Sequence, residues 1–375
     1  MNIVVAPDSF KGSLSSVQAA DLMKNAVTAV DDDSTVTMKP MADGGEGTME
    51  SLLASASGVR VPLTCTGPLG EAIDTTYAIT GTDCAIIECA RIAGLVQVSP
   101  DKRNPDQTTT YGIGEAILHA LDSGCTSFIL AIGGSATNDG GLGMLQALGM
   151  QAWDRNGHQV GLFGRDVHHV QHVRFDTIDS RLAEADIHVA SDVDNPLCGA
   201  RGASAVYGPQ KGATEEQINQ YDAALDVYAD AVEAALGTSW KDDPGAGAAG
   251  GLGFALLAIG GQLASGAKLL ADAMNLEDVI QSADLVLTGE GQSDEQTLYG
   301  KAPGYTATLA NKHGVPAILI SGSLSGNTDK LHEQFSGFFS IIQQPMSLAM
   351  CMEKADELLF DQTKHVVHLV QHFRA

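Results

Sequence analysis

Three sequence signatures of common enzyme classes are missing from this chain. No loop matches the dinucleotide fingerprint G-x-G-x-x-G, because the G-L-G at 251–253 lacks the third glycine. No Walker A loop occurs, because the Gly-Lys at 300–301 is followed by alanine and has the wrong upstream spacing. The G-x-S-x-G elbow is absent as well. These absences argue against a Rossmann dehydrogenase, a P-loop NTPase and an α/β-hydrolase.

Cysteine is scarce, and the six residues present form no C-x-x-C pair and no metal-binding spacing. Buried free thiols in a reducing compartment are the interpretation that this pattern favours. Nowhere do 18 apolar residues follow one another, and residues 1–6 run straight into a predicted strand without a charged leader. The sequence therefore predicts a cytoplasmic, soluble protein with no membrane partner.

Positive charge is also in short supply. The chain has 21 Lys and Arg against 46 Asp and Glu, for a formal net charge of −25 at pH 7. Such a surface repels nucleic acid and anionic membranes, so neither is expected as a partner. If the ligand is an anion, a few lysines or arginines near its loop, or a bound divalent cation, must reverse the field locally.

Glycine is abundant instead, at 42 of 375 residues, and it gathers in discrete loops. The longest loop follows an apolar run at 128–132 and precedes leucines at helical spacing. Four glycines in it surround Ser135, Thr137, Asn138 and Asp139. One polar residue suffices to cap a helix, so we expect this strand, loop and helix to bind an anion or a substrate. A simple helix cap is the alternative.

Two more loops near the N-terminus follow predicted strands. Asp8 and Lys11 lie after a strand at 2–6, where the lysine can reach a phosphate or carboxylate or form a surface pair with Asp8. Asp43 and Glu46 flank two glycines directly before a helix. Two carboxylates at this spacing suit Mg²⁺, which prefers oxygen ligands, although acidic residues also favour a helix N-terminus without any metal.

The central part of the chain adds a carboxylate and a lysine. Asp192 follows a predicted strand at 187–190 and precedes Pro196, so it is a candidate general base or metal ligand, with an Asx turn as the alternative. Lys211 stands between glycines before an acidic helix and is a candidate phosphate contact.

The alternation of elements predicts an α/β protein of two domains. Residues 1–60 and 275–375 share a strand-loop-helix pattern and are predicted to form one discontinuous, Rossmann-like parallel-sheet domain. Residues 61–274 begin with alternating apolar and polar residues between turns, a pattern typical of antiparallel strands. They are predicted to form an inserted mixed α/β domain. We expect a cleft between the two.

Several longer motifs occur along the chain: VAPDSFKGS at 5–13, PMADGGEGT at 40–48, GPLG at 67–70, RNP at 103–105, IGGSATNDGG at 132–141, DVDNPL at 192–197, GPQKGA at 208–213, GAGAAGG at 245–251 and TGEG at 288–291. Taken together, these motifs resemble the bacterial glycerate kinase family. The match covers most of the chain in the right order. Ser191, where a cysteine is usual, and Gln292, where an arginine often follows Gly-Glu-Gly, depart from the family pattern.

The resemblance implies transfer of the γ-phosphoryl group of ATP, with Mg²⁺, to a hydroxyl of D-glycerate, with 2-phosphoglycerate favoured, by a monomer or homodimer. Phosphoryl transfer needs positioning and charge neutralisation, which the glycine-rich loops, lysines and carboxylates supply. Catalysis is assigned to Asp192, Lys11 and Asp8, and the metal to Asp43 and Glu46. Binding of substrate or nucleotide is assigned to Ser9, Gly133, Gly134, Ser135, Thr137, Asn138, Asp139, Arg103, Lys211, Gly289, Glu290 and Lys301.

Two rival interpretations come from other classes of protein. A nicotinamide-dependent hydroxy-acid dehydrogenase shares the α/β texture but needs the dinucleotide fingerprint that is missing here. A non-catalytic hydroxy-acid binding protein needs a hinged site and no nucleotide. Release of ADP in the presence of D-glycerate separates the kinase from both.

Overall fold

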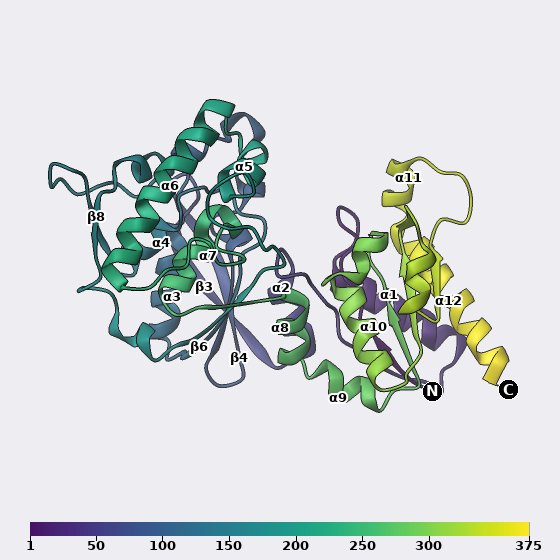
Figure 1. Ribbon diagram of the computed structural model, residues 1–375. Coiled ribbons are helices and arrows are strands. Elements are labelled where there is room, and N and C mark those ends of the chain that lie inside the picture. The colour runs from purple at the N-terminus through teal and green to yellow at the C-terminus, as the bar shows by residue number, and fades with distance from the viewer. Residues whose placement is uncertain (375) are drawn as a thin grey trace. The chain divides into compact units, whose positions relative to one another are not determined.

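The computed structural model describes residues 1–374, which divide into two compact units, each built on its own β-sheet (Figure 1). Unit 1 contains Met1–Asp43, Glu50–Ser57 and residues 265–374, and unit 2 contains Gly44–Met49 and Gly58–Ala264. The predicted α/β class, with a discontinuous parallel-sheet domain and an inserted mixed domain, is confirmed. Residues 265–274, predicted within the insert, group with unit 1, where the Lys39 ammonium donates to the Met274 carbonyl at 2.8 Å.

The sheet of unit 1 is parallel throughout. Its strands, in spatial order, are β15 (Gly337–Ser340), β13 (Ala317–Ser321), β11 (Leu285–Thr288), β1 (Asn2–Val5) and β2 (Thr35–Met38). A short parallel pair, β12 (Gln292–Ser293) and β14 (Ser323–Leu324), follows β11 and β13. The strand-loop-helix pattern predicted for residues 1–60 and 275–375 is therefore present in these strands.

Helices cover both faces of this sheet, which is why the central strands β1, β11 and β13 are mainly apolar and buried. Ile3, Val5, Leu287 and Ile320 point to one face and pack against α1 (Ser16–Val30) and α12 (Ala355–Arg374). Val4 and the other alternate residues point to the opposite face, where α10 (Ala302–Lys312) contacts β11 and β13. The remaining helices of unit 1 are α8 (Gly266–Ala273), α9 (Leu276–Gln281) and α11 (Leu348–Glu353), while α2 (Thr48–Ser55) begins in unit 2 and continues in unit 1.

Unit 2 has a six-stranded mixed sheet. In spatial order its strands are β10 (Gln262–Ala264), β9 (Asp186–Ala190), β6 (Ser127–Ala131), β5 (Cys84–Glu88), β4 (Ala72–Thr80) and β3 (Gly58–Thr66). The first four run parallel, whereas β3, β4 and β5 form the predicted antiparallel meander. A separate two-stranded antiparallel sheet pairs β7 (Gln151–Trp153) with β8 (His172–Arg174).

One large apolar core holds unit 2 together, built from buried side chains of the sheet and of the surrounding helices. Those helices are α3 (Tyr111–Asp122), α4 (Leu142–Ala147), α5 (Ala203–Tyr207), α6 (Glu215–Leu236) and α7 (Ala248–Ala258). Thr214 caps α6 through its hydroxyl, and Gln217 returns the bond in a capping box. Among residues 1–374, no helix is both long and apolar enough to cross a membrane.

The parallel strands bring loops that are distant in sequence to a shared carboxyl edge in each unit. In unit 1 the loops after β1 and β11 meet, and the Asp8 N–H donates to the Gly289 carbonyl at 2.8 Å. In unit 2, β6 and β9 are neighbours, so the loops at 132–141 and 191–197 start side by side. These two edges hold most of the predicted site residues.

Candidate functional site

Unit 1 contains an acidic cluster, which we define as Asp8, Asp43 and Glu290 with Lys11 and Lys301. Asp8 and Lys11 follow β1, and Glu290 and Lys301 follow β11, so the parallel pairing of these strands brings them together. Each of the three carboxylates acts electrostatically on Lys11, and both Asp43 and Glu290 act on Asp8. All five had been predicted as site residues, and the fold places them at one sheet edge.

Asp8 is the most deeply perturbed member of the acidic cluster. Its side chain is 6% exposed, and its Oδ1 accepts a hydrogen bond from the Ser9 N–H at 2.6 Å. Burial, followed by the charges of Asp43 and Glu290, raises the pKa of Asp8 to about 7, against the opposing effect of Ser9 and Lys11. A nearby cation stabilises the ionised form of a carboxyl group that is surrounded by other carboxyl groups in this way.

Lys11 forms its ion pair with Asp43, not with Asp8. The Lys11 ammonium lies 3.0 Å from Asp43 Oδ2, and the lysine side chain is 77% exposed. Asp43 accordingly raises the pKa of Lys11, so the side chain is cationic at neutral pH. An exposed lysine pair contributes little to stability, which leaves Lys11 free to meet a negatively charged ligand.

Glu290 is held from its other side by hydroxyl groups. Its Oε1 accepts from Ser293 Oγ at 2.9 Å and from Thr297 Oγ1 at 2.6 Å, and Lys301 Nζ lies 3.8 Å from Oε2. Neither hydroxyl was singled out from the sequence, although both follow Glu290 within one short loop. Their effect is to orient a carboxylate that is 7% exposed.

The predicted metal pair, Asp43 and Glu46, is divided between the units. Asp43 belongs to unit 1 and is half-buried, whereas Glu46 belongs to unit 2 and is exposed. Oxygen-only ligation of Mg²⁺ needs one or two carboxylates besides waters and phosphates. Within unit 1, Asp8 and Asp43 are two carboxylates that act on each other electrostatically, which is the kind of donor pair that Mg²⁺ takes, and Glu46 stays a predicted ligand.

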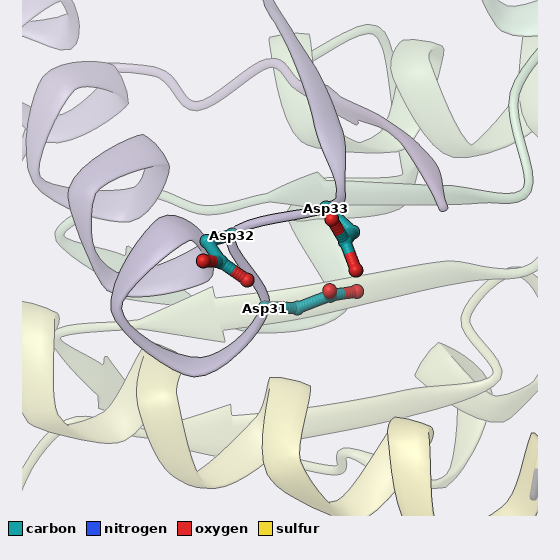
Figure 2. Close-up of side chains that lie close together, drawn as sticks. All are labelled: Asp31, Asp32 and Asp33. Atoms are coloured by element: carbon teal, nitrogen blue, oxygen red, sulfur yellow. The ribbon is translucent and has the colours of Figure 1, made fainter.

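A second acidic group lies elsewhere in unit 1. Asp31, Asp32 and Asp33 each offer an oxygen within 4.8 Å of the others (Figure 2). They connect α1 to β2 and so lie at the amino edge of the sheet, opposite the acidic cluster. Asp31 accepts from the Ser34 hydroxyl, which accepts in turn from the Met1 ammonium at 3.1 Å. The three aspartates therefore lie in a turn whose Asp31 contacts the N-terminal ammonium through the Ser34 hydroxyl.

In unit 2 the predicted glycine-rich loop lies over the end of β6 and meets Lys211. Lys211 is 2% exposed, and its ammonium donates to Ser135 Oγ at 3.0 Å and to the Thr137 carbonyl at 2.6 Å. Burial lowers the pKa of Lys211 to about 8. We call Lys211, Ser135, Thr137 and Asn138 the lysine loop site.

Asp139 is buried directly behind the lysine loop site. Its Oδ2 accepts from the Thr110 N–H at 2.9 Å, from the Thr110 hydroxyl at 2.7 Å and from the Gly143 N–H at 3.4 Å, and its Oδ1 accepts from the Gly141 N–H at 3.1 Å. Burial raises the pKa of Asp139, and these bonds oppose the rise. Because all four partners are donors, Asp139 fixes the start of α4 and the shape of the loop.

The glycine-rich segment at 245–251 packs against the loop at 132–141. Ala249, Gly250 and Gly251 have left-handed backbones with φ of 53°, 73° and 89°, inside α7. A Cβ on Gly250 would stand 2.0 Å from the Thr137 carbonyl oxygen, the same atom that accepts from Lys211. Only glycine fits there, so the segment is a close-packed support and not a linker.

Asp192 lies at the adjacent loop, one residue after Ser191 at the end of β9. It is exposed, as is Asp194, which pairs with Arg201 at 2.8 Å. Arg103 is half-exposed; its Nε donates to the Val98 carbonyl at 3.4 Å, and its backbone packs against Gly212, next to Lys211. Unit 2 therefore brings Asp192, the lysine loop site and the Arg103 segment to one end of its sheet.

Two residues of unit 2 carried no signal in the sequence. Ser204 Oγ accepts from the Asn138 side-chain amide at 2.9 Å. Glu88, 1% exposed at the end of β5, accepts from the Met49 N–H at 2.8 Å and from Arg91 Nε at 2.7 Å. The Asn138–Ser204 and Met49–Glu88 contacts join residues 66 and 39 positions apart, which the periodicity of the sequence does not reveal.

The chain is similar to known proteins over nearly its whole length. The model of the glycerate kinase family matches residues 3–371. The chain is 44% identical to a glycerate 2-kinase of Escherichia coli K12 over 345 residues, covering 91% of each, and 42% identical to a glycerate kinase of Haemophilus influenzae over 373 residues, covering 99% of each. A solved structure described as a putative glycerate kinase 2 from Salmonella typhimurium LT2 has a TM-score of 0.90 at 41% identity, covering 100% of this chain and 99% of that one. The chain therefore belongs to the glycerate kinase family.

Proposed function

We propose that this protein transfers the γ-phosphoryl group of ATP to D-glycerate, at the 2-hydroxyl in preference to the 3-hydroxyl. The observation that carries the proposal is the acidic cluster, in which two buried carboxylates and one half-buried carboxylate share a sheet edge with two lysines. Such a mixture suits a polyphosphate bound with a divalent cation. Preference for the 2-hydroxyl is supported by the Escherichia coli relative, which is named a glycerate 2-kinase.

Within the acidic cluster, Asp8 and Asp43 would hold Mg²⁺, and Lys11 and Lys301 would contact phosphate oxygens. The ion supplies neutralisation of the negative charge on the phosphates. Ser9 and the Gly289 backbone line the same edge, where the Ser9 N–H already points to a carboxylate oxygen. In unit 2, Asp192 is the proposed acceptor of the glycerate hydroxyl proton. A monomer or homodimer in the cytoplasm completes the proposal.

The proposal is tested by measuring ADP release with a panel of acceptors. D-Glycerate should give ADP, whereas glycerol, which lacks the carboxylate, should not. Phosphorus NMR of the product distinguishes 2-phosphoglycerate from 3-phosphoglycerate. Reduction of NAD without ADP release would favour the dehydrogenase, and tight glycerate binding without turnover would favour a binding protein.

Lys11→Met tests the acidic cluster. We expect turnover to fall at least about tenfold, or about 1.4 kcal/mol of transition-state stabilisation, because an exposed cation beside the phosphates is lost. The fold should persist, since the side chain is 77% exposed. Steady-state kinetics and circular dichroism measure the two effects.

Lys24→Met is the matched control, because Lys24 is an exposed lysine on α1, away from the acidic cluster. It should behave as the wild type. Equal kinetics of Lys11→Met and Lys24→Met would reduce the Lys11–Asp43 contact to a surface ion pair.

A further inference from the structure

Glu88 is a buried carboxylate that contacts two separate segments of unit 2. Its side chain is 1% exposed, Oε1 accepts a hydrogen bond from the Met49 N–H at 2.8 Å, and Oε2 accepts from Arg91 Nε at 2.7 Å. A buried ion pair often stabilises a protein no more than apolar side chains of similar volume do, because burial removes water from both charges. Compared with an apolar residue, Glu88 therefore contributes mainly a fixed geometry of the two segments that donate to it.

The place of Glu88 in the sheet is next to the start of the glycine-rich loop, residues 132–141. Glu88 is the last residue of β5 and pairs with Ala131, the last residue of β6. The glycine-rich loop begins at the next position after Ala131. The two segments that donate to Glu88, residues 44–49 and residues 89–97, therefore meet it at the same end of the sheet as this loop.

Residues 44–49 contact the first part of the glycine-rich loop. The Gly133 N–H donates to the Gly44 carbonyl at 3.2 Å, and a Cβ on Gly133 would stand 2.8 Å from the Gly45 Cα. Gly44 has a φ of 82°, and a Cβ there would stand 2.8 Å from the Ala190 Cβ at the end of β9. This segment thus packs closely against the ends of both β6 and β9, without room for a side chain at Gly44.

Residues 89–97 contact the next part of the glycine-rich loop. Gly94 and Ser135 form an isolated antiparallel bridge. Arg91, which donates to Glu88, ends the 3₁₀ turn Cys89–Arg91 just before this bridge. Two backbone hydrogen bonds of 2.8 Å flank the bridge, from the Leu95 N–H to the Gly134 carbonyl and from the Ala136 N–H to the Ala93 carbonyl.

We infer that Glu88 positions the glycine-rich loop through these two neighbouring segments. It holds residues 44–49 through the Met49 N–H and residues 89–97 through Arg91, and each segment fixes a different part of the loop. Glu88 is a positioning residue, because its carboxylate is buried and acts through other residues. The inference rests on the proposed function in one respect: under it, the loop that Glu88 positions binds a substrate of phosphoryl transfer.

Hydrogen exchange of the full chain, measured by mass spectrometry, tests the inference without any substrate. In Glu88→Gln the side chain keeps its length, but its NH₂ faces one of the two donors in either orientation, so one segment loses its anchor. The exchange rates of residues 132–141 should rise at least about tenfold, together with those of residues 44–49 or 89–97. The separate sheet of β7 and β8 should exchange as in the wild type, whereas global destabilisation would raise exchange there as well.

Arg91→Met and Arg91→Lys test one of the two segments by itself. The Arg91 side chain is 35% exposed, so both variants should fold. Arg91→Met removes the donor and should raise exchange in residues 89–97 and 132–141 while leaving residues 44–49 as in the wild type. Arg91→Lys keeps a cation beside Glu88 and should restore most of the protection. The two variants decide the inference even where Glu88→Gln fails to fold.

Steady-state kinetics connects the position of the glycine-rich loop to catalysis. A displacement of about 1 Å can lower a rate about 100-fold. At a temperature where Glu88→Gln is fully folded, its kcat/KM for D-glycerate should be at least about tenfold below that of the wild type. Asp83→Asn is the matched control, because Asp83 directly precedes β5, at the opposite edge of the sheet, and accepts from the Thr82 and Thr126 hydroxyls. It should keep wild-type kinetics.

Three outcomes would overturn the inference. Wild-type exchange of residues 132–141 in Glu88→Gln would mean that glycine packing alone holds the loop. Exchange that rises equally in β7 and β8 would reduce Glu88 to a general stabilising role, and wild-type kcat/KM despite faster exchange of the loop would separate its position from catalysis. A wild-type protein that releases no ADP would refute the kinase proposal instead, and the exchange experiment would still decide the role of Glu88.

Discussion

Asp192→Asn is expected to lower the turnover number about 100- to 10,000-fold while leaving the Mg²⁺ dependence unchanged. The residue follows β9 after a single serine, beside the loop that contains the lysine loop site, and Pro196 restricts the backbone after it. Asparagine preserves size but removes the charge and most of the basicity, so it cannot accept the hydroxyl proton. Steady-state kinetics at several Mg²⁺ concentrations measure both quantities.

The same substitution separates two roles of Asp192. A metal ligand would show a raised Mg²⁺ requirement that excess metal partly restores, whereas a general base would not. Asp194→Asn is the matched control, because Asp194 is exposed in the same loop and pairs with Arg201. Wild-type kinetics of Asp192→Asn at every Mg²⁺ concentration would exclude both roles and move attention to Asp8 and Asp43.

The local elements of the site could be predicted from the sequence. The apolar run at 128–132 became β6, and the leucines that follow became α4, because a short run bounded by glycine and a 3.6-residue repeat are strong local signals. The alternation of apolar and polar residues after residue 60 likewise predicted the antiparallel strands β3, β4 and β5. Strand ends then brought the polar loops to the sheet edges.

The partners of individual side chains could not be predicted in the same way. Lys211 and Ser135 are separated by 76 residues, and Asp139 and Thr110 by 29. Asp43 and Glu46 are only three residues apart, yet they belong to different units. Such pairings depend on strand order and burial, which leave no periodic trace in the sequence, so the metal pair and the role of Asp139 stayed open.

Asp139→Asn is expected to destabilise unit 2 by about 1–3 kcal/mol, and the melting temperature should fall by about 2–12 °C. The carboxylate accepts from two N–H groups of the α4 start and from the N–H and the hydroxyl of Thr110. In either orientation, the asparagine amide sets its NH₂ against at least one buried N–H, which leaves donors unsatisfied. Thermal unfolding followed by circular dichroism measures the change.

Asp176→Asn controls for loss of a carboxylate from unit 2, because Asp176 is an exposed partner of Arg174. It should change stability by no more than about 0.5 kcal/mol. Thr110→Val should fall between the two, since it removes one of the four donors that Asp139 accepts. If Asp139→Asn kept full stability but lost glycerate or ATP binding, Asp139 would contact the ligand directly, as the sequence predicted, and the loop would be held by its glycine packing alone.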